Sequence, residues 1–214
     1  MAWTTPKTWT ASVVTVSDLN THIRDNLNVL KTSINDDGTL DTVFNRQVTL
    51  QTVANTVTET AVYTLSVPGG TLGTTKGLRL SLIGDQINNS GAGRTHTVRV
   101  KYGATTIFEA ACSNVGNTAT RSSLLLELEL VAANATNAQR AKGMMCLGEG
   151  GATDTAGVAR THSESTSDAT IFFSVHNAIA EDSTAAKNLV VTYQMNNANA
   201  SEDMRAHTVY VEKK

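Results

Sequence analysis

The hydrophobic period of this sequence changes at Gly38, and that change constrains the fold more than any other feature. After Gly38, apolar side chains recur at every second position, as in strands with one buried and one exposed face. Within 124–130, four leucines face one way while Glu127 and Glu129 face the other. The same alternation predicts strands over 63–67, 78–82, 96–102, 106–111, 143–147, 170–177, 189–195 and 207–211.

No helical pattern of useful length interrupts these strands, and turns rich in Gly, Asn and Ser separate them. We therefore expect a mainly β domain over 39–214, built as an antiparallel two-sheet sandwich of jelly-roll type with about nine or ten strands. The chain has 214 residues, which allows one such domain and a small appendage. The sequence also predicts a hairpin turn over 102–105 and longer loops over 84–94, 115–121 and 148–167.

Before Gly38 the apolar residues follow a helical period. They fall within an arc of about 80° on a helical wheel, narrower than the face that a helix usually packs on a globular core. Thr15 and Asp18 form a capping box at its start, and Gly38 is a suitable C-terminal cap. A helix with so narrow a seam and so many Asn and Thr residues needs a partner, so we expect a short bundle of identical helices in a homotrimer. The seam consists of Val16, Leu19, Ile23, Leu27, Leu30 and Ile34.

The segment that precedes this helix is an arm that contains Trp3 and Trp9. Tryptophan is unfavourable in water, so we expect the arm to dock against another surface; the alternative is that it folds back on its own domain. Residues 1–38 are thus expected to form an arm and an anchoring or oligomerisation helix. The N-terminus lacks the pattern of a secretory signal and no run is long enough to span a bilayer, which favours a protein made in the cytoplasm without a membrane partner.

The composition and motifs exclude most catalytic and binding chemistries. With 17 Lys+Arg against 19 Asp+Glu, the chain has no excess of positive charge for nucleic acid. The 5 histidines lack the spacing of a metal site or an acid–base pair, and His96 and His176 are expected as buried or interface residues. Cys112 and Cys146 have neither a CxxC spacing nor partnering histidines, so two small, buried or half-buried residues are expected, with a disulfide between them as the alternative. We expect no enzyme, no metal and no cofactor.

The segment 9–30 resembles the N-terminal segment of many tailed-bacteriophage virion proteins of the tail-fibre, head-fibre and minor structural types. The shared features are a Trp-Thr pair at 9–10 and the helix Leu-Asn-Thr-His-Ile-Arg-Asp-Asn-Leu at 19–27. Several polar residues of that helix are not needed for amphipathicity, so the match is fairly specific, although 11–13 departs from the turn that relatives often carry. The resemblance implies an anchor followed by an exposed module, with the anchor residues Trp3, Trp9, Asn20, His22, Arg24, Asp25 and Asn26.

The same resemblance implies a structural protein of the virion, made in the host cytoplasm, whose partners are its own copies and a major capsid protein or a tail or adaptor protein. A helix of about 30 Å and one sandwich are short for a tail fibre that reaches the host, which favours a capsid decoration or short head fibre. The alternative is a tail-fibre or receptor-binding module that recognises a host-surface glycan. The expected long loops contain no aromatic residue for a sugar platform, which weighs against that alternative.

Overall fold

The computed structural model describes residues 43–148 and 171–214, together with Ile23, Arg24 and Leu27. The chain divides into two compact units, Met1–Thr42 and Val43–Lys214. Nearly all of the expected arm and helix lies outside the described residues, so the fold given below is that of the second unit.

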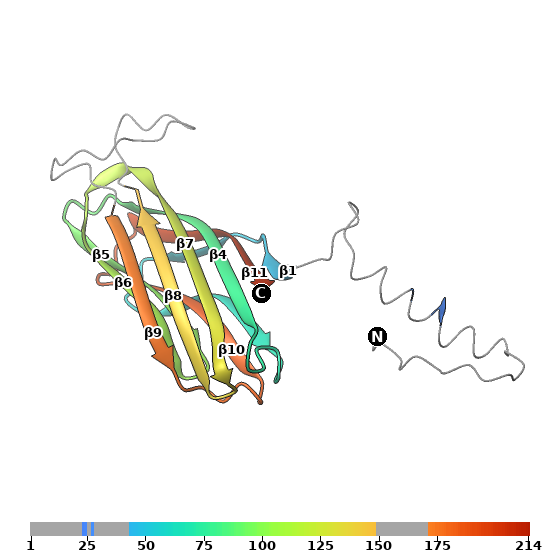
Figure 1. Cartoon of the computed structure of the whole chain (residues 1–214). Helices are drawn as coiled ribbons and strands as arrows, with labels where there is room; N and C mark the ends of the chain where they lie inside the picture. Colours follow the sequence, from blue (N-terminus) through green and yellow to red (C-terminus); the bar gives the residue numbers. More distant parts are fainter. Residues whose placement is uncertain (1–22, 25–26, 28–42, 149–170) are drawn as a thin grey trace, which may run out of the picture. The chain divides into compact units, whose positions relative to one another are not determined.

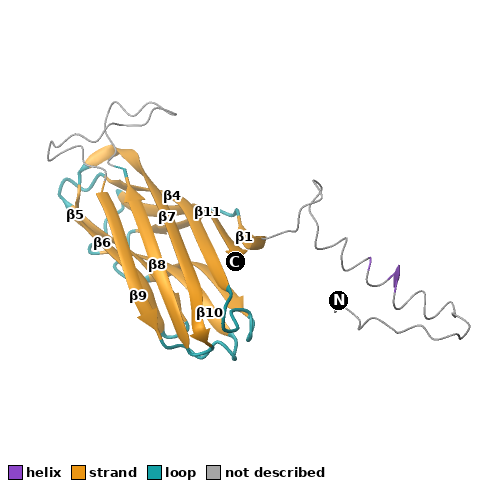
Figure 2. Cartoon of the chain, in the orientation of Figure 1, coloured by secondary structure: helices purple, strands orange, loops and turns teal. Residues whose placement is uncertain are grey.

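The second unit consists of strands joined by turns (Figures 1 and 2), and eleven strands lie within its described residues. All nine of the expected strands are among them, although most are longer than the alternating runs. The strands are β1 (Val43–Gln47), β2 (Gln51–Ala54), β3 (Thr60–Val67), β4 (Gly77–Asn88), β5 (Arg94–Tyr102), β6 (Thr105–Val115), β7 (Thr118–Ala135), β8 (Ala138–Leu147), β9 (Ile171–Ile179), β10 (Lys187–Met195) and β11 (Glu202–Lys213).

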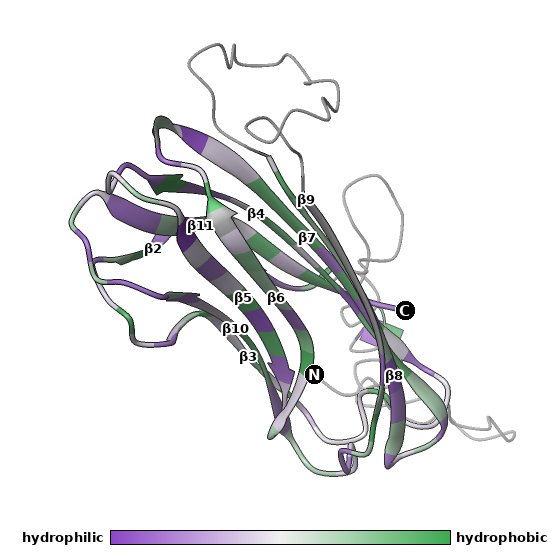
Figure 3. Cartoon of the chain, turned by 90° about the vertical axis from the view of Figure 1, so that its left-hand side faces the viewer, coloured by the Kyte–Doolittle hydropathy of each residue, from purple (hydrophilic) through white to green (hydrophobic). Residues whose placement is uncertain are grey.

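These strands form two sheets that face each other as two layers (Figure 3). The seven-stranded sheet has the order β1-β11-β4-β7-β8-β9, with β2 also paired to β11, and the four-stranded sheet has the order β3-β10-β5-β6. Every pairing between the described strands is antiparallel. The chain crosses between the sheets after β2, β3, β4, β6, β9 and β10. The expectation of a mainly β, antiparallel two-sheet sandwich is therefore confirmed.

The core lies between the sheets and is built largely from leucines at alternate positions. Leu80 lies opposite Leu128, and Leu82 opposite Leu126, where β4 pairs with β7, and all four side chains are buried. Because side chains alternate along a strand, Glu127 between them points to the outer face and remains partly exposed. The alternation seen in the sequence at 78–82, 96–102 and 124–130 thus marks the buried face correctly. The four-stranded sheet contributes Val98, Val100, Tyr102, Leu189, Val191 and Tyr193 to the same core.

Two of the expected long loops are largely strand. Residues 84–88 continue β4, so only 89–93 connect it to β5, and only residues 116 and 117 separate β6 from β7. The polar composition of these stretches suggested loops, but Gln86 and Asn88 are buried, and Asn88 Nδ2 donates to the carbonyl of Val115 over 2.7 Å. Buried hydrogen bonds therefore replace apolar contacts at this end of β4. Of the third expected loop, residues 149–167 lie outside the described part of the chain.

The strands β1 and β2 are not among the expected strands. Both strands are short and pair with β11, and most of their residues are exposed or half-exposed, so the two-residue hydrophobic period is weak. Side-chain hydrogen bonds join β1 to the opposite sheet instead. The hydroxyl of Tyr63 donates to Asn45 Oδ1 over 2.8 Å, and Gln47 Nε2 donates to the carbonyl of Val62 over 3.0 Å.

Close packing requires a glycine at two positions of the sandwich. Gly103 lies in the expected hairpin turn between β5 and β6 with a φ of 61°, and a Cβ there would lie 2.5 Å from the carboxylate of Glu181. Gly143 on β8 faces the core, where a Cβ would lie 2.5 Å from the ring of Phe108. Phe108 can therefore pack directly against the backbone of the seven-stranded sheet.

Neither cysteine is part of a disulfide, and both are buried or half-buried, as the sequence predicts. Cys112 is buried on β6, and Cys146 is half-buried on β8. Burial raises the pKa of the Cys146 thiol, which keeps it in the protonated, less reactive form.

Candidate functional site

The structure describes three of the residues that the sequence analysis proposes for anchoring and self-association. Ile23, Arg24 and Leu27 have helical backbone (Figure 2), and the side chains of Ile23 and Leu27 are 47% and 57% exposed. A spacing of four residues puts these two apolar side chains on one face of a helix, as expected for residues that pack on a partner. The other candidates lie outside the described residues: Trp3, Trp9, Val16, Leu19, Asn20, His22, Asp25, Asn26, Leu30 and Ile34.

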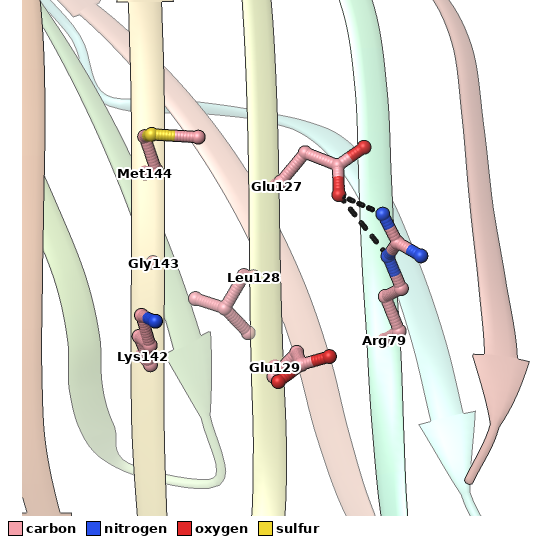
Figure 4. A pocket seen from close by; sticks show the side chains of 7 residues that line it. All are labelled: Arg79, Glu127, Leu128, Glu129, Lys142, Gly143 and Met144. Carbon is pink, nitrogen blue, oxygen red and sulfur yellow. Dashed lines mark hydrogen bonds and ion pairs between the residues drawn. The ribbon is translucent and has the colours of Figure 1, made fainter.

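The outer face of the seven-stranded sheet carries a hollow of about 210 Å³ between β4, β7 and β8 (Figure 4). Arg79 and Glu127 form an ion pair at one side of it, and Ser81 Oγ donates to Glu127 Oε1 over 3.2 Å. Lys142 and Met144 line the other side, from β8. Binding pockets for small molecules usually measure about 300–1,000 Å³, and here the guanidinium is already neutralised by a carboxylate. The hollow is therefore a shallow part of the surface with paired charges.

An apolar patch lies beside this hollow on the same outer face. Ile83 lies directly opposite Leu125, and Leu125 directly opposite Cys146, so the three residues form a row across β4, β7 and β8. Ile83 and Leu125 are 51% and 44% exposed, and Met144, two residues before Cys146 on β8, is 50% exposed. We call these four residues the outer-face patch. Alternation would place polar residues at these outward positions, so the patch is a departure from the pattern of the rest of the sheet.

Charged side chains from β4, β7 and β11 form an ion-pair cluster on this face. Arg121 pairs with both Asp85 and Asp203, and His207 Nε2 lies 2.7 Å from Asp85 Oδ2. Burial raises the pKa of Asp85, but hydrogen bonds from Arg121 and His207 outweigh it and hold the pKa below its usual value. The pairing of β11 with β4 is irregular between Ala206 and Thr208, at the position of His207. Each of the two carboxylates is already paired with a cation, so neither is available to a ligand. The ion pairs instead connect the strands β4, β7 and β11.

The outer face of the four-stranded sheet has no large, exposed apolar side chain in its described strands. Arg99 Nε donates to Glu109 Oε2 over 2.7 Å, and Lys101 Nζ lies 2.5 Å from Glu59 Oε1. The hydrogen bond from Lys101 lowers the pKa of Glu59, and a second one from Thr192 acts in the same direction. This face is therefore a polar surface of paired charges, unlike the face that carries the outer-face patch.

A buried glutamate lies at each end of β5, and the first of these is Glu181. Its Oε1 accepts hydrogen bonds from the backbone N–H of Ala104 over 3.0 Å and from Thr105 Oγ1 over 2.8 Å. Its Oε2 accepts from Lys187 Nζ over 2.9 Å. The hydrogen bond from Lys187 is the largest effect that lowers the pKa of this carboxyl. Both carboxylate oxygens have partners, and they join the β5–β6 turn to the start of β10.

The second buried glutamate, Glu202, has a different environment. Its Oε1 accepts from Arg94 Nε over 2.8 Å, but its Oε2 has no hydrogen-bond partner and lies 3.8 Å from His96 Nε2, which has none either. His96 Nδ1 lies 2.6 Å from Gln86 Oε1, and a carbonyl can only accept, so Nδ1 carries the proton of the neutral ring. An acceptor on His96 thus faces an acceptor on Glu202. Burial lowers the pKa of His96, although Glu202 acts in the opposite direction.

The described residues contain no group of three or more His, Cys, Asp or Glu that could hold a metal ion. They also contain no helix that is long and apolar enough to cross a membrane. The rings of Tyr63, Tyr102, Phe108 and Tyr193 are buried in the core, where none can form a platform for a sugar.

The sequence analysis missed the outer-face patch, although a signal for it is present. Ile83 directly follows Leu82, and Leu125 lies between two buried leucines, so an apolar side chain must fall on the outward side at both positions. His96 is buried, as expected. Its pairing with Gln86 and Glu202 has no sequence signal, because the strands β4 and β5 belong to different sheets and Glu202 lies on β11, far along the chain.

Comparison with known proteins gives no family for this chain. No family model and no curated protein matches the sequence. Among solved structures, a lectin, UEA-II complexed with galactose, aligns with a TM-score of 0.31 and 8% identity over 85% of this chain and 89% of the lectin. The CBM2 module of the evolved Dit of Lactobacillus casei BL23 phage J-1 aligns with a TM-score of 0.29 and 8% identity over 70% and 67% of the two chains. A structure of infectious bursal disease virus, Gt strain, aligns with a TM-score of 0.28 and 11% identity over 82% of this chain and 43% of the viral chain. Likenesses this weak carry no argument about function.

Proposed function

We propose that this chain is a structural protein of a tailed-phage particle, attached through residues 1–38 and displaying the β-sandwich outward. The observation that carries the proposal is the motif at 9–30, whose polar residues Asn20, His22 and Arg24 are not needed for amphipathicity alone. The division of the chain at Thr42 supports separate anchoring and displayed parts. The N-terminal helix and the jelly-roll type of the sandwich belong to this proposal.

Within the particle, we assign the protein to the capsid, as a decoration or short head fibre that forms a homotrimer through its helical seam. Two seam residues, Ile23 and Leu27, have half-exposed side chains and the spacing of one helix face, which supports a partner for this face. A helix of about 30 Å with one sandwich is short for a fibre that reaches the host. The partners are then other copies of the chain and the major capsid protein, with a tail or adaptor protein as the competing attachment site.

The surface of the sandwich supports a displayed, non-enzymatic role. The ion pairs on its two outer faces are satisfied within the sandwich, as between Arg121 and Asp85 or between Arg99 and Glu109. Groups that bind or transform a substrate are instead usually left available, with perturbed pKa values in a pocket. We therefore propose no catalytic activity and no cofactor for this protein.

The location on the particle is tested by mass spectrometry of purified heads and purified tails. We expect the chain in the head fraction at a constant ratio to the major capsid protein. Enrichment in the tail fraction would contradict the assignment to the capsid and favour a tail-fibre role. Absence from both fractions would contradict a structural role in the virion.

The anchor is tested with Trp3→Ala combined with Trp9→Ala in the full chain. A buried interface tryptophan contributes on the order of 1–2 kcal/mol or more, so occupancy on the particle should fall at least about tenfold at limiting concentration. The melting temperature of the free protein should not change. The matched control is Thr4→Ala with Thr8→Ala in the same arm, which should bind normally. A double tryptophan variant that melts several degrees lower yet binds normally would show that the arm packs on its own domain.

The competing function, recognition of a host-surface glycan, is tested with the same purified protein on a glycan array. We expect no specific binding, because the described aromatic rings of the core are unavailable to a sugar. Specific binding that is lost when residues 149–170 are shortened would favour a receptor-binding module instead.

A further inference from the structure

Most of the exposed apolar side chains in the described part of the sandwich lie in two regions, with Val57 and Val131 outside both, and one of the two regions is the N-terminal edge. Val43, Val48 and Leu50 are 44%, 62% and 48% exposed, and all three fall within eight consecutive residues. Val43 lies in β1, and Val48 and Leu50 lie in the connection between β1 and β2. We call residues 43–54, which comprise both strands and this connection, the edge segment. The other region is the outer-face patch around Ile83 and Leu125.

The edge segment lies at the margin of the seven-stranded sheet. Its two strands pair along β11, β1 with the C-terminal half and β2 with the N-terminal half, and within the described residues no further strand pairs with β1. The inner side of β1 is already engaged, because Asn45 and Gln47 are hydrogen-bonded to β3 and Phe44 packs against the core beneath Lys213 Nζ. Proteins usually protect a sheet margin with charge or proline, whereas Val48 and Leu50, in the connection between β1 and β2, add exposed apolar surface beside this margin.

The position of the edge segment in the chain indicates what covers it. It directly follows Met1–Thr42, the unit that contains the seam through which we propose that three copies associate. Only nine peptide steps separate Ile34, the last seam residue, from Val43. Nine residues span at most about 30 Å, so in a bundle formed by the seams each edge segment begins within about 30 Å of the end of its own seam. The edge segments of the three copies therefore start near one end of the bundle.

We propose that the edge segment of one copy packs against the edge segment of the next copy in the trimer, with Val43, Val48 and Leu50 as the contacting side chains. This inference rests on the proposed function, because the occupant is a second copy of this chain. Three half-exposed aliphatic side chains supply on the order of 300 Å² per copy, against about 800 Å² per partner in a standard interface. The edge segment is therefore too small to hold the trimer alone and strengthens an association that the seam provides.

The test compares two double variants of the full chain by mass photometry over a range of concentrations. Val48→Asp with Leu50→Asp puts charge into the edge segment, and the matched control, Ile83→Asp with Leu125→Asp, puts charge into the outer-face patch. We expect the edge variant to raise the concentration of half-dissociation at least tenfold and the control to leave it unchanged. An unchanged midpoint in the edge variant, or an equal rise in both variants, would overturn the inference.

Two further measurements keep the outcome clear. If either aspartate variant fails to fold, as judged by circular dichroism, the pairs Val48→Ser with Leu50→Ser and Ile83→Ser with Leu125→Ser replace them with the same expectations. In a Cys146→Ser background, Val48→Cys should form disulfide-linked dimers under oxidation, and Asn89→Cys in the β4–β5 turn should not. An unmodified chain that is monomeric at all concentrations would overturn the proposed trimer. An unmodified trimer that is insensitive to the edge variant would overturn the edge contact alone.

Discussion

The two ends of the sandwich are each closed by a buried glutamate, but only one of the two carboxylates is fully hydrogen-bonded. Glu181 uses both oxygens, with a backbone N–H, a hydroxyl and an ammonium as donors. Glu202 uses one oxygen, and the other faces the unprotonated nitrogen of His96 at 3.8 Å. The same residue type, 9% exposed at Glu181 and 1% exposed at Glu202, thus forms a complete cluster at one end and an incomplete one at the other. A buried polar group stabilises a fold only to the extent that it is satisfied.

The largest effect is expected where the cluster is complete. In Glu181→Gln, an amide nitrogen must replace an oxygen that accepts from Lys187 or from Ala104 and Thr105, so a donor faces a donor. We expect the free energy of unfolding to fall by about 2 kcal/mol, measured by urea denaturation at pH 7. Asp182→Asn, at the exposed neighbouring position, is the control and should change little. A loss in Glu181→Gln no larger than that of the control would contradict the comparison.

A smaller effect is expected from acid at the incomplete end. The pKa of His96 lies below its ordinary value of 6.5 because burial disfavours the imidazolium. Below pH 6.5 the unfolded chain therefore binds a proton that the folded chain does not, and stability falls as the pH is lowered. We expect a loss of about 1 kcal/mol between pH 7.5 and 5.5 that is absent in His96→Gln.

The variant isolates His96 from the other histidines, which are present in both proteins. The carboxyl of Glu181 does not contribute to a loss of stability in this pH range. Because its pKa is lowered on folding, its contribution to the free energy of unfolding is present above its ordinary pKa of 4.5 and is lost only in stronger acid. Parallel stability curves for the two proteins between pH 7.5 and 5.5 would show that His96 is not the source of the loss.

A still smaller effect, of opposite sign to that at Glu181, is expected for Glu202→Gln. The amide oxygen can keep the hydrogen bond from Arg94, and the amide nitrogen supplies the donor that His96 Nε2 lacks. The lost charge attraction to Arg94 offsets part of this gain. We expect the free energy of unfolding to rise by less than about 1 kcal/mol, measured beside Glu181→Gln in the same urea series. A loss as large as that of Glu181→Gln would mean that both ends are equally satisfied.

The smallest effect is expected when an unpartnered group is simply removed. The hydroxyl of Tyr193 is buried without a hydrogen-bond partner, and burial raises its pKa far above the usual value. Tyr193→Phe deletes that hydroxyl and keeps the ring, so stability should stay within about 0.5 kcal/mol of the unmodified protein or rise. Thermal unfolding followed by circular dichroism measures this; a drop of several degrees would reveal a partner for the hydroxyl.

Much of the fold could be predicted from the sequence because its central strands are half-buried. Leu126 and Leu128 are buried in the core, whereas Glu127 lies on the outer face, where a charged residue is tolerated. The sequence therefore shows a hydrophobic period of two residues. Where a strand is attached by other means, the period is lost. The strand β1 is held by Asn45 and Gln47 through hydrogen bonds, and no hydrophobic pattern records such a contact.

The surfaces were less predictable than the fold. The outer-face patch forms because Leu125 on β7 lies opposite Ile83 on β4 and Cys146 on β8. These neighbours follow from the pairing of three strands, which the local sequence does not show. The buried cluster of Glu202 combines residues from β4, β5 and β11, and their meeting depends on the strand order. The local sequence determines which side chains are buried, whereas the pairing of distant strands determines which buried side chains are in contact.

The leucine pairs between β4 and β7 do not by themselves determine the register in which the two strands pair. Because leucine recurs at every second position on both strands, a shift of β7 by two residues along β4 would again set leucine against leucine at most sites. Gly143 removes this ambiguity. If the β7–β8 hairpin shifted as a unit, Ala141 or Met145 would replace Gly143 over Phe108, where the space admits no Cβ. A single missing side chain therefore acts against misaligned sheets during folding, while the leucines stabilise any of them.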